Sequence, residues 1–204
     1  MSVAGYVLAG GASRRFGADK ARAIVSGQTM LQRIGALLQE VASPVALVAA
    51  DESTYTDSRI PFVKDGWPGE GPLGGIVTAL GTSAAANPAI HWNLIVSCDM
   101  PFLTREWLKF LIEHAQQSDA QAVVARSAHG VEPLCASWRT DAISLLQPAF
   151  EGGMRRVNDG LKLLRTEVLD EAVWKRFDSD GRLFWNMNTR QDYEEARRIL
   201  EFKT

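Results

Sequence analysis

A short segment near the N-terminus, Gly10–Lys20, combines glycines with basic side chains. It holds three glycines, two arginines and one lysine in eleven residues, and it follows an apolar run, 3–8, that is typical of a buried strand. Glycines let the backbone come close to a ligand, and successive backbone N–H groups can form a concave anion site. Arg15 and Lys20 add full positive charges beside it. This combination favours binding of a polyphosphate.

The spacing within this loop excludes two common phosphate-binding motifs. A Walker A loop has a Lys directly after its last glycine and then a Ser or Thr, whereas Lys20 comes three residues after Gly17 and is followed by Ala21. The Gly-x-Gly-x-x-Gly pattern of dinucleotide-binding folds is also absent. The alternative is a solvated basic turn, but turn composition alone does not require clustered basic residues beside the glycines.

A second chemical feature is a carboxylate at the end of a predicted strand. Asp99 follows the apolar run 94–96 and precedes Met100-Pro101. An isolated Asp at such a point commonly forms a turn or caps a helix. Beside a triphosphate, however, a carboxylate is the kind of ligand that Mg²⁺ takes, with phosphate oxygens and water completing the coordination. We therefore predict that Asp99 binds Mg²⁺, and that Cys98 packs into the core.

The elements that must position these loops alternate between strand-like and helix-like runs. Predicted strands lie at 3–8, 45–50, 60–63, 93–97, 120–125 and 133–138, and predicted helices at about 29–41, 73–86, 104–115 and 191–200, with two more within 141–170. Such alternation is typical of an α/β fold with a parallel sheet. Because ligands bind beyond the carboxyl ends of parallel strands, we expect the loops after 3–8, 60–63 and 93–97 to share one crevice.

Composition limits the classes of function. The 204 residues are enough for one α/β domain, and the formal net charge of −2 does not suggest a nucleic-acid partner. No apolar run reaches the roughly 18–20 residues that span a bilayer, and the N-terminus lacks a secretory pattern. Cys98 and Cys135 do not make a disulfide framework, and the three histidines lack metal-ligand spacing. We expect a single cytoplasmic domain, 1–204, without nucleic-acid or membrane partners.

The N-terminal loop resembles the signature Leu-Ala-Gly-Gly-x-Ser-x-Arg-Met-Gly-x-Asp-Lys of the molybdenum cofactor guanylyltransferases. The matching residues are Leu8, Ala9, Gly10, Gly11, Ser13, Arg15, Gly17, Asp19 and Lys20. Phe16 stands where Met is usual. Related cytidylyltransferases tend to have Ala at the position of Gly10, so Gly10 favours guanine. The segment 97–102 resembles the family's Cys-Asp-x-Pro-[Phe/Tyr] segment, in which the Asp binds the metal.

A second glycine-rich segment resembles the same family. Gly71-Pro72-Leu73-Gly74-Gly75 is similar to the family's Gly-Pro-Leu-[Ala/Gly]-Gly segment, which lines the base and ribose pocket. Asp65 corresponds to an Asp that contacts the nucleotide in that family. Two alternatives stand beside these roles: close packing of a helix also favours Gly74 and Gly75, and Asp65 is also suited to an Asx turn before Gly66.

A third resemblance lies near the C-terminus. Asn186-Met187-Asn188-Thr189 is similar to the start of the family's Asn-x-Asn-Thr-Pro-x-Asp segment, with Arg190 in place of Pro. Side chains two positions apart face the same side of an extended segment, so Asn186 and Asn188 are candidates to contact the acceptor phosphate, the metal or the pterin. The alternative, which the sequence favours equally, is that Thr189 or Asn188 caps the last helix.

The resemblance implies a Rossmann-like three-layer α/β domain with a mostly parallel sheet, as in nucleotide-diphospho-sugar transferases. The implied reaction transfers GMP from GTP to molybdenum-bearing molybdopterin, with Mg²⁺ as cofactor and pyrophosphate as product. The residues assigned to catalysis are Lys20, Arg15 and Asp99. Those assigned to nucleotide binding are Leu8, Ala9, Gly10, Gly11, Lys20, Asp65, Gly71, Pro72 and Asp99. Candidate protein partners are molybdenum-insertion proteins and chaperones of molybdoenzymes.

Two other functions remain compatible with these residues. A cytidylyltransferase or another sugar-phosphate nucleotidyltransferase would share the phosphate loop and Asp99 but differ in base pocket and acceptor. A non-catalytic nucleotide or cofactor carrier would not need both Lys20 and Asp99, so their joint presence disfavours it. One strand departs from the family: Glu132-Pro133-Leu134 has Glu132 where the family has His or Gln, which leaves the acceptor contacts there open.

Overall fold

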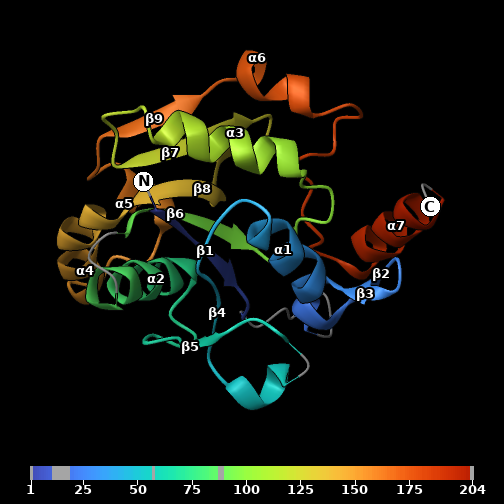
Figure 1. The fold of residues 1–204 in the computed structure, drawn as a ribbon, viewed down its shortest axis with the longest axis horizontal. Helices are drawn as coiled ribbons and strands as arrows, with labels where there is room; N and C mark the ends of the chain where they lie inside the picture. The colour runs from blue at the N-terminus through green and yellow to red at the C-terminus, as the bar shows by residue number, and fades with distance from the viewer. Residues whose placement is uncertain (1, 11–18, 57, 87–89, 203–204) are drawn as a thin grey trace.

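A seven-stranded sheet forms the centre of the computed structural model, which describes residues 2–10, 19–56, 58–86 and 90–202 (Figure 1). The strands, in their order across the sheet, are β5 Phe62–Lys64, β4 Val45–Ala49, β1 Ser2–Leu8, β6 Ile90–Ser97, β8 Gly130–Arg139, β7 Ala122–Ser127 and β9 Thr166–Leu169. Only β8 runs antiparallel to its neighbours within this described sheet. The predicted α/β fold with a mostly parallel sheet is confirmed.

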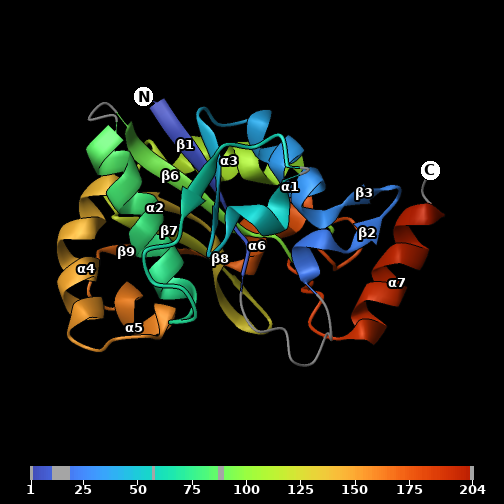
Figure 2. The ribbon, with the colours of Figure 1, turned by 90° about the horizontal axis from the view of Figure 1, so that it is seen from below.

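Helices cover both faces of the sheet. They are α1 Met30–Gln39, α2 Pro72–Ala86, α3 Arg105–Ala115, α4 Ile143–Glu151, α5 Val157–Leu161, α6 Glu171–Trp174 and α7 Arg190–Glu201. Figure 2 shows α4 and α5 at one side of the molecule and α7 at the opposite side, next to the small hairpin of β2 Ile24–Val25 and β3 Gln28–Thr29. The result is the expected three-layer arrangement of helices, sheet and helices.

The continuous apolar run of β1 is explained by burial on both sides of the sheet. Val3 and Val7 belong to a cluster that packs α1 and α3 against one face, whereas Ala4 and Tyr6 belong to a cluster that packs α2, α4 and α5 against the other. Successive side chains of a strand point to opposite faces, so a strand covered on both faces needs apolar residues throughout. This burial fixes the position of the carboxyl end of β1.

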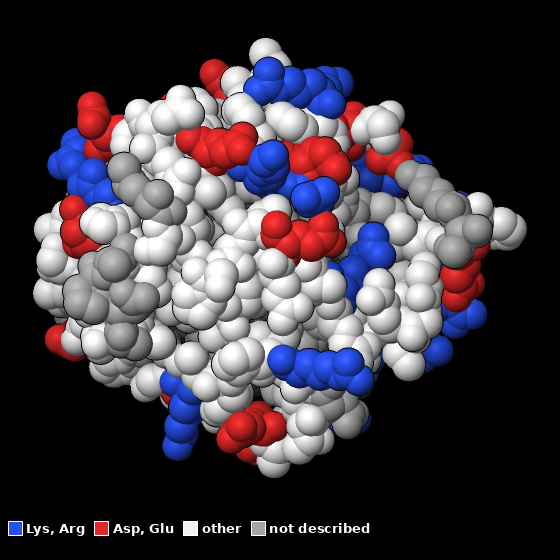
Figure 3. Space-filling model, viewed as in Figure 1, with Lys and Arg blue, Asp and Glu red and all other residues white. Residues whose placement is uncertain are grey.

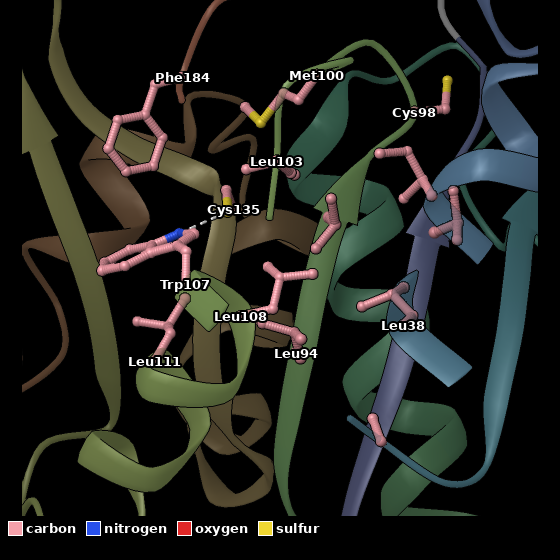
Figure 4. Close-up of a cluster of buried hydrophobic side chains, with 14 of the residues drawn as sticks. Leu38, Leu94, Cys98, Met100, Leu103, Trp107, Leu108, Leu111, Cys135 and Phe184 are labelled. Atoms are coloured by element: carbon pink, nitrogen blue, oxygen red, sulfur yellow. Dashed lines mark hydrogen bonds between the residues drawn. The ribbon is translucent and has the colours of Figure 1, made fainter. Parts of the chain in front are cut away.

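The cluster under α3 includes both cysteines (Figure 4). The indole Nε1–H of Trp107, which is fully buried, donates to Sγ of Cys135 at 3.4 Å. Cys98 is buried as well, as predicted, and both thiols are free. Burial raises the pKa of the Cys135 thiol to about 12 and also raises the pKa of Cys98. Both thiols therefore act as apolar core groups and not as nucleophiles.

Helix starts follow the capping signals in the sequence. Thr29 Oγ1 accepts from the backbone N–H of Gln32, and Gln32 Oε1 accepts from the backbone N–H of Thr29, which together begin α1. At the start of α3, Thr104 Oγ1 accepts from the backbone N–H of Trp107. The predicted positions of these two helices are confirmed.

Three features differ from the sequence-based expectation. The predicted strands 120–125 and 133–138 form one antiparallel hairpin, β7–β8, because Gly130 turns the chain at φ +118°, a value that glycine adopts easily. The β2–β3 hairpin and the short strand β9 were not predicted. β9 has four residues and pairs only with β7 in the described sheet, so its pattern is too short to recognise.

The surface and the helices agree with the composition. Figure 3 shows acidic and basic side chains interspersed over one face, without a broad patch of either sign. Within the described ranges, every helix is too short or too polar to cross a membrane.

Candidate functional site

The loops after β1 and β6 begin side by side. The parallel register places Leu8 opposite Ser97, and the backbone N–H of Cys98 donates to the carbonyl of Leu8 at 3.2 Å. On the other side of β1, the N–H of Ala9 donates to the carbonyl of Val48 in β4. Leu8 and Ala9 are therefore held at the carboxyl edge of the sheet, where the crevice was expected.

Lys20 lies at the centre of this edge. It begins a short 3₁₀ turn, Lys20–Arg22, which Asp19 caps by accepting the N–H of Ala21. Its Nζ donates to Oδ2 of Asp99 and to Oδ1 of Asn188, each at 2.9 Å. The Lys20 and Asp99 side chains are only 16% and 15% exposed, so their charges interact with less solvent screening than at an open surface. One ammonium joins three segments that are far apart in sequence.

Asp99 is held from two directions. Ser97 Oγ donates to Asp99 Oδ1 at 2.7 Å, so each carboxylate oxygen has a donor. The backbone carbonyl of Asp99 accepts the N–H of Met187 at 2.9 Å, which fastens the C-terminal segment to the end of β6. These contacts fix both the position and the orientation of the carboxylate.

The oxygen atoms at this point suit a hard divalent cation. The Asp99 carboxylate and the Asn188 amide oxygen are the donor types that Mg²⁺ takes, and both already face the positive charge of Lys20. Among the described residues, no three His, Cys, Asp or Glu side chains are arranged so that they could hold a metal ion. A metal here would therefore share its coordination between these protein oxygens, phosphate oxygens and water.

The described part of the N-terminal loop leaves its backbone open. Gly10 has φ +131°, which a side chain would strain, and a Cβ placed on it would meet no atom of the described residues within 4 Å. Gly11 and Arg15 lie outside the described residues, so their predicted roles remain predictions.

Asp65 forms an Asx turn, which the sequence analysis gave as the alternative to a contact with the nucleotide. Its Oδ1 accepts from the backbone N–H of Trp67 and from the hydroxyl of Thr78, each at 3.0 Å. Farther along the chain, Gly71 has φ +94°, and Pro72 is the first residue of α2, a position that proline favours. The predicted contacts of Asp65, Gly71 and Pro72 with a nucleotide stay predictions.

Gly74 is explained by packing. A Cβ on it would lie 2.9 Å from Cβ of Trp67 and 3.2 Å from Cζ of Phe150. Those two rings meet edge-on at 5.2 Å, and the guanidinium of Arg155 lies 4.3 Å from the centre of the Phe150 ring. A Cβ on Gly75 would lie 3.4 Å from Cδ2 of Leu8, an ordinary van der Waals contact. Packing, the alternative given for these glycines, therefore accounts for Gly74.

In the C-terminal segment the structure shows the predicted helix cap, and the contacts predicted for Asn186 and Asn188 with a substrate or metal stay predictions. Thr189 caps α7 in a capping box with Asp192, whereas the side chain of Asn188 contacts Lys20. Asn186 donates from Nδ2 to the carbonyl of Phe184. Arg190 is the first residue of α7, so the proline usual in the family would fit the same position.

A cavity of about 510 Å³ adjoins this segment, and both Asn186 and Asn188 line it. We call it the Glu132 cavity. Its wall also includes three aromatic and three acidic side chains, namely Trp174, Phe184, Trp185, Glu132, Asp178 and Asp192. None of the described residues that line it is Lys or Arg. The cavity is thus lined by aromatic and acidic side chains, with His129 beside them, and Asn188 connects it to Lys20.

Glu132 is the most enclosed of these acids. It is 8% exposed, and Ser127 Oγ donates to its Oε1 at 2.5 Å. Burial raises the pKa of Glu132, and the nearby charge of Asp99 acts in the same direction. β8 runs antiparallel to β6, so the first residues of β8 lie next to the end of β6 that Asp99 follows.

Sequence reasoning missed three residues of the site. Ser97 orients Asp99, and Trp174 and Trp185 line the Glu132 cavity. The Trp185 ring stacks on Phe102 at 5.3 Å with a 14° angle between the planes. Two signals were available, since Ser97 begins the recognised segment 97–102 and Trp185 directly precedes Asn186. Trp174 reaches the cavity only through the tertiary fold.

Comparisons with known proteins agree with one another. Residues 5–166 match the family model described as MobA-like NTP transferase domain. A probable molybdenum cofactor guanylyltransferase of Chloroflexus aggregans is 32% identical, covering 98% of this chain and 96% of its own length. A molybdenum cofactor guanylyltransferase of Syntrophotalea carbinolica is 29% identical over 94% and 89% of the two chains. The crystal structure of molybdopterin-guanine dinucleotide biosynthesis protein A from Archaeoglobus fulgidus superimposes with a TM-score of 0.81 at 26% identity, covering 99% of this chain and 100% of that chain.

Proposed function

The chain belongs to the MobA-like NTP transferase family, and from this we propose that it transfers GMP from GTP to the phosphate of molybdenum-bearing molybdopterin. The observation that carries the proposal is the position of the Lys20 ammonium, 2.9 Å from both Asp99 and Asn188. It unites the phosphate loop, the carboxylate after β6 and the C-terminal amide in one place. These are the groups that a phosphoryl-transfer site needs to gather.

The proposed reaction is a substitution at the α-phosphorus of GTP. An oxygen of the acceptor's phosphate forms the new bond to phosphorus, and the bond from phosphorus to the bridging oxygen breaks. The electron pair of that bond leaves with pyrophosphate. A phosphate monoester has a second pKa near 6, so it is mostly dianionic at about pH 7 and needs no general base. Catalysis then rests on positioning and on stabilising charge.

The residues have distinct roles in this proposal. Lys20, Arg15 and the backbone N–H groups of Gly10 and Gly11 stabilise the negative charge of the triphosphate. Asp99, with Asn188 beside it, would hold Mg²⁺, which when bound supplies positive charge to the phosphate groups.

The remaining contacts divide between the two substrates. The residues proposed to hold the nucleotide besides the phosphate loop are Leu8, Ala9, Asp65, Gly71 and Pro72. Asn186 and Asn188 are proposed to face the acceptor, since both line the cavity next to Lys20.

The proposal also treats residues 1–204 as one cytoplasmic domain. The Tyr193 hydroxyl of α7 donates to the carbonyl of Ile24 at 2.9 Å, which supports a C-terminal helix that is part of the same body. Free, buried Cys98 and Cys135 are consistent with a reducing compartment. Proteins that insert molybdenum or receive the finished cofactor are the proposed partners.

The experiment combines product analysis with nucleotide choice. The purified chain is given molybdenum-bearing molybdopterin, Mg²⁺ and one of GTP, CTP, ATP or UTP, and pyrophosphate release and product mass are measured. We expect release with GTP, dependent on the acceptor, and a product heavier than the acceptor by one GMP residue. Thermal-shift measurements with the same nucleotides give binding separately, because a ligand of the native state raises the melting temperature.

The nucleotides separate the alternatives. A product formed from CTP in preference to GTP would replace guanylyl by cytidylyl transfer and leave nucleotidyl transfer intact. Binding of GTP without pyrophosphate release from any nucleotide would overturn the enzymatic proposal in favour of a carrier.

A further inference from the structure

In the Glu132 cavity, only one of the two oxygens of the Glu132 carboxyl group accepts a hydrogen bond from a described residue. Glu132 is 8% exposed, and its Oε1 accepts from Ser127 at 2.5 Å. Among the described residues only Ser127 donates to this carboxyl group, and the cavity lining includes His129 but no Lys or Arg. Oε2 is not one of the fully buried side-chain atoms that lack a partner, so it is reached from the cavity and can accept hydrogen bonds from a ligand there.

The walls of the cavity define the shape of that ligand. Trp174, Phe184 and Trp185 line it, and Trp174 meets Phe184 edge-on at 5.1 Å. Aromatic walls favour a flat ring system. A volume of about 510 Å³ is within the usual range for a small-molecule site.

The carboxylate defines the edge of the ring. An ionised carboxylate only accepts hydrogen bonds, so the ring must present N–H groups to Glu132. A 2-amino-4-oxopyrimidine edge carries two adjacent N–H donors, one on the ring nitrogen and one on the amino group, that match the two oxygens of a carboxylate. We propose that Glu132 binds this edge of the acceptor's ring and thereby selects a pterin as the acceptor. This inference rests on the proposed function, because it assigns the acceptor's ring to a cavity next to the phosphate site.

Guanine carries the same pair of N–H donors as a pterin. The order of the strands, however, places the residues proposed to bind GTP and those proposed to bind the pterin on opposite sides of the phosphate site. Lys20 and Asp99 follow β1 and β6 in the middle of the sheet, Asp65 follows β5 on one side, and Glu132 lies in β8 on the other side. A nucleoside on the β5 side and a pterin on the β8 side can then both reach the phosphate site. Asn188 supports this arrangement, because it lines the Glu132 cavity and accepts from Lys20.

The experiment measures a ratio of affinities. Wild type and Glu132→Gln, as full chains, are titrated by calorimetry with 6-hydroxymethylpterin and with 6-hydroxymethyllumazine, in which an oxo group replaces the 2-amino group. Wild type should prefer the pterin by roughly tenfold or more, because lumazine loses a donor to a charged acceptor and turns a carbonyl toward it. Glutamine offers one acceptor and one donor, which match lumazine, so the variant should lose or reverse the preference.

A matched control neutralises another acid of the same cavity. Asp178 Oδ1 already accepts the backbone N–H groups of Arg182 and Leu183, so Asp178→Asn should leave the preference for pterin unchanged. Where Glu132→Gln does not fold, Ser127→Ala replaces it. Loss of that hydroxyl frees Oε1, and the preference should fall several-fold. A merely structural Glu132 would alter both affinities equally, which would overturn the inference.

A second control tests whether the guanine of GTP, and not the pterin, binds to Glu132. Affinities for GTP and for ITP, which lacks the 2-amino group, should keep the same ratio in Glu132→Gln as in wild type. A changed GTP-to-ITP ratio with an unchanged pterin-to-lumazine ratio would place guanine in the cavity and overturn the assignment. The titrations need no turnover, so an active enzyme with a flat pterin ratio refutes this inference alone, whereas absence of GTP-dependent pyrophosphate release refutes the proposed function.

Discussion

The ammonium of Lys20 and the carboxylate of Asp99 lie 2.9 Å apart, although 79 positions separate them in the sequence. Both side chains are about 85% shielded from solvent, with 16% and 15% exposure. Removing one partner of a shielded pair leaves the other charge without compensation, which destabilises the fold as well as the site. Tests of either residue therefore need a stability measurement beside the rate.

Lys20→Ala should lower kcat/KM for GTP by about 100- to 1000-fold, as loss of a donor to developing charge does in other enzymes. Lys20→Arg should restore only part of the rate, because a planar guanidinium replaces a compact ammonium. Steady-state pyrophosphate release with GTP and molybdopterin gives the comparison. Lys162→Ala is the control, since Lys162 is 75% exposed and pairs only with Asp159 among the described residues. A wild-type rate in Lys20→Ala would remove this loop from the catalytic site.

Asp99→Asn and Ser97→Ala should affect the metal requirement to different degrees. The first removes the charge that is proposed to hold Mg²⁺, so turnover should be lost at every Mg²⁺ concentration while the protein stays folded. The second removes only the hydroxyl that donates to Asp99 Oδ1 at 2.7 Å. Ser97→Ala should then need more Mg²⁺ for half-maximal rate and approach the wild-type kcat at saturation. The rate is measured against Mg²⁺ concentration, and equal curves for wild type and Asp99→Asn would show that the metal lies elsewhere.

The parallel part of the sheet was predictable because its strands are buried on both faces. The run before Gly10 is apolar at successive positions, and only a strand covered by helices on each side has that pattern. The β7–β8 hairpin was not predicted, because its reversal is the two-residue turn Ala128-His129, followed by Gly130 at positive φ, and composition does not distinguish this turn from a loop. Local patterns therefore identified the elements but not the direction of β8.

The candidate site shows the same division. Motifs identified Lys20, Asp99 and Asn188 separately, and the rule that loops gather at the carboxyl edge of a parallel sheet predicted their meeting. The two hydrogen bonds from the Lys20 ammonium to Asp99 and Asn188 depend on the tertiary structure, and the spacing of the motifs in the sequence does not predict them. The Glu132 cavity is another, since its walls come from β8, the segment around Trp174 and the stretch before α7.

Glu132→Gln should change how stability depends on pH. Burial raises the pKa of Glu132 in the folded protein above its unfolded value, so the stability that the protonated form contributes is complete below the unfolded pKa and is lost as the pH rises through the folded pKa. Gln does not ionise. The melting temperature of the variant minus that of wild type should therefore increase as the pH rises above the ordinary Glu pKa of about 4.3. Taking the difference cancels the other titrating groups, and a difference that is constant with pH would contradict a raised pKa.

Replacing Gly74 or Gly81 of α2 by alanine should have opposite effects on stability, because one position is crowded and the other is open. A Cβ at Gly74 would lie 2.9 Å from Cβ of Trp67, an atom next to the backbone that cannot rotate away, whereas a Cβ at Gly81 would meet no atom of the described residues within 4 Å. Gly81→Ala should stabilise the protein by about 0.5–1 kcal/mol through helix propensity. Gly74→Ala should destabilise it by about 1–3 kcal/mol, as overpacking does. The shift of Trp67 should also displace the turn at Asp65 and raise KM for GTP in Gly74→Ala alone. Urea unfolding and steady-state kinetics of the two variants measure both effects. Equal stability of the two variants would show that the contact with Trp67 relaxes without cost and that packing does not explain Gly74.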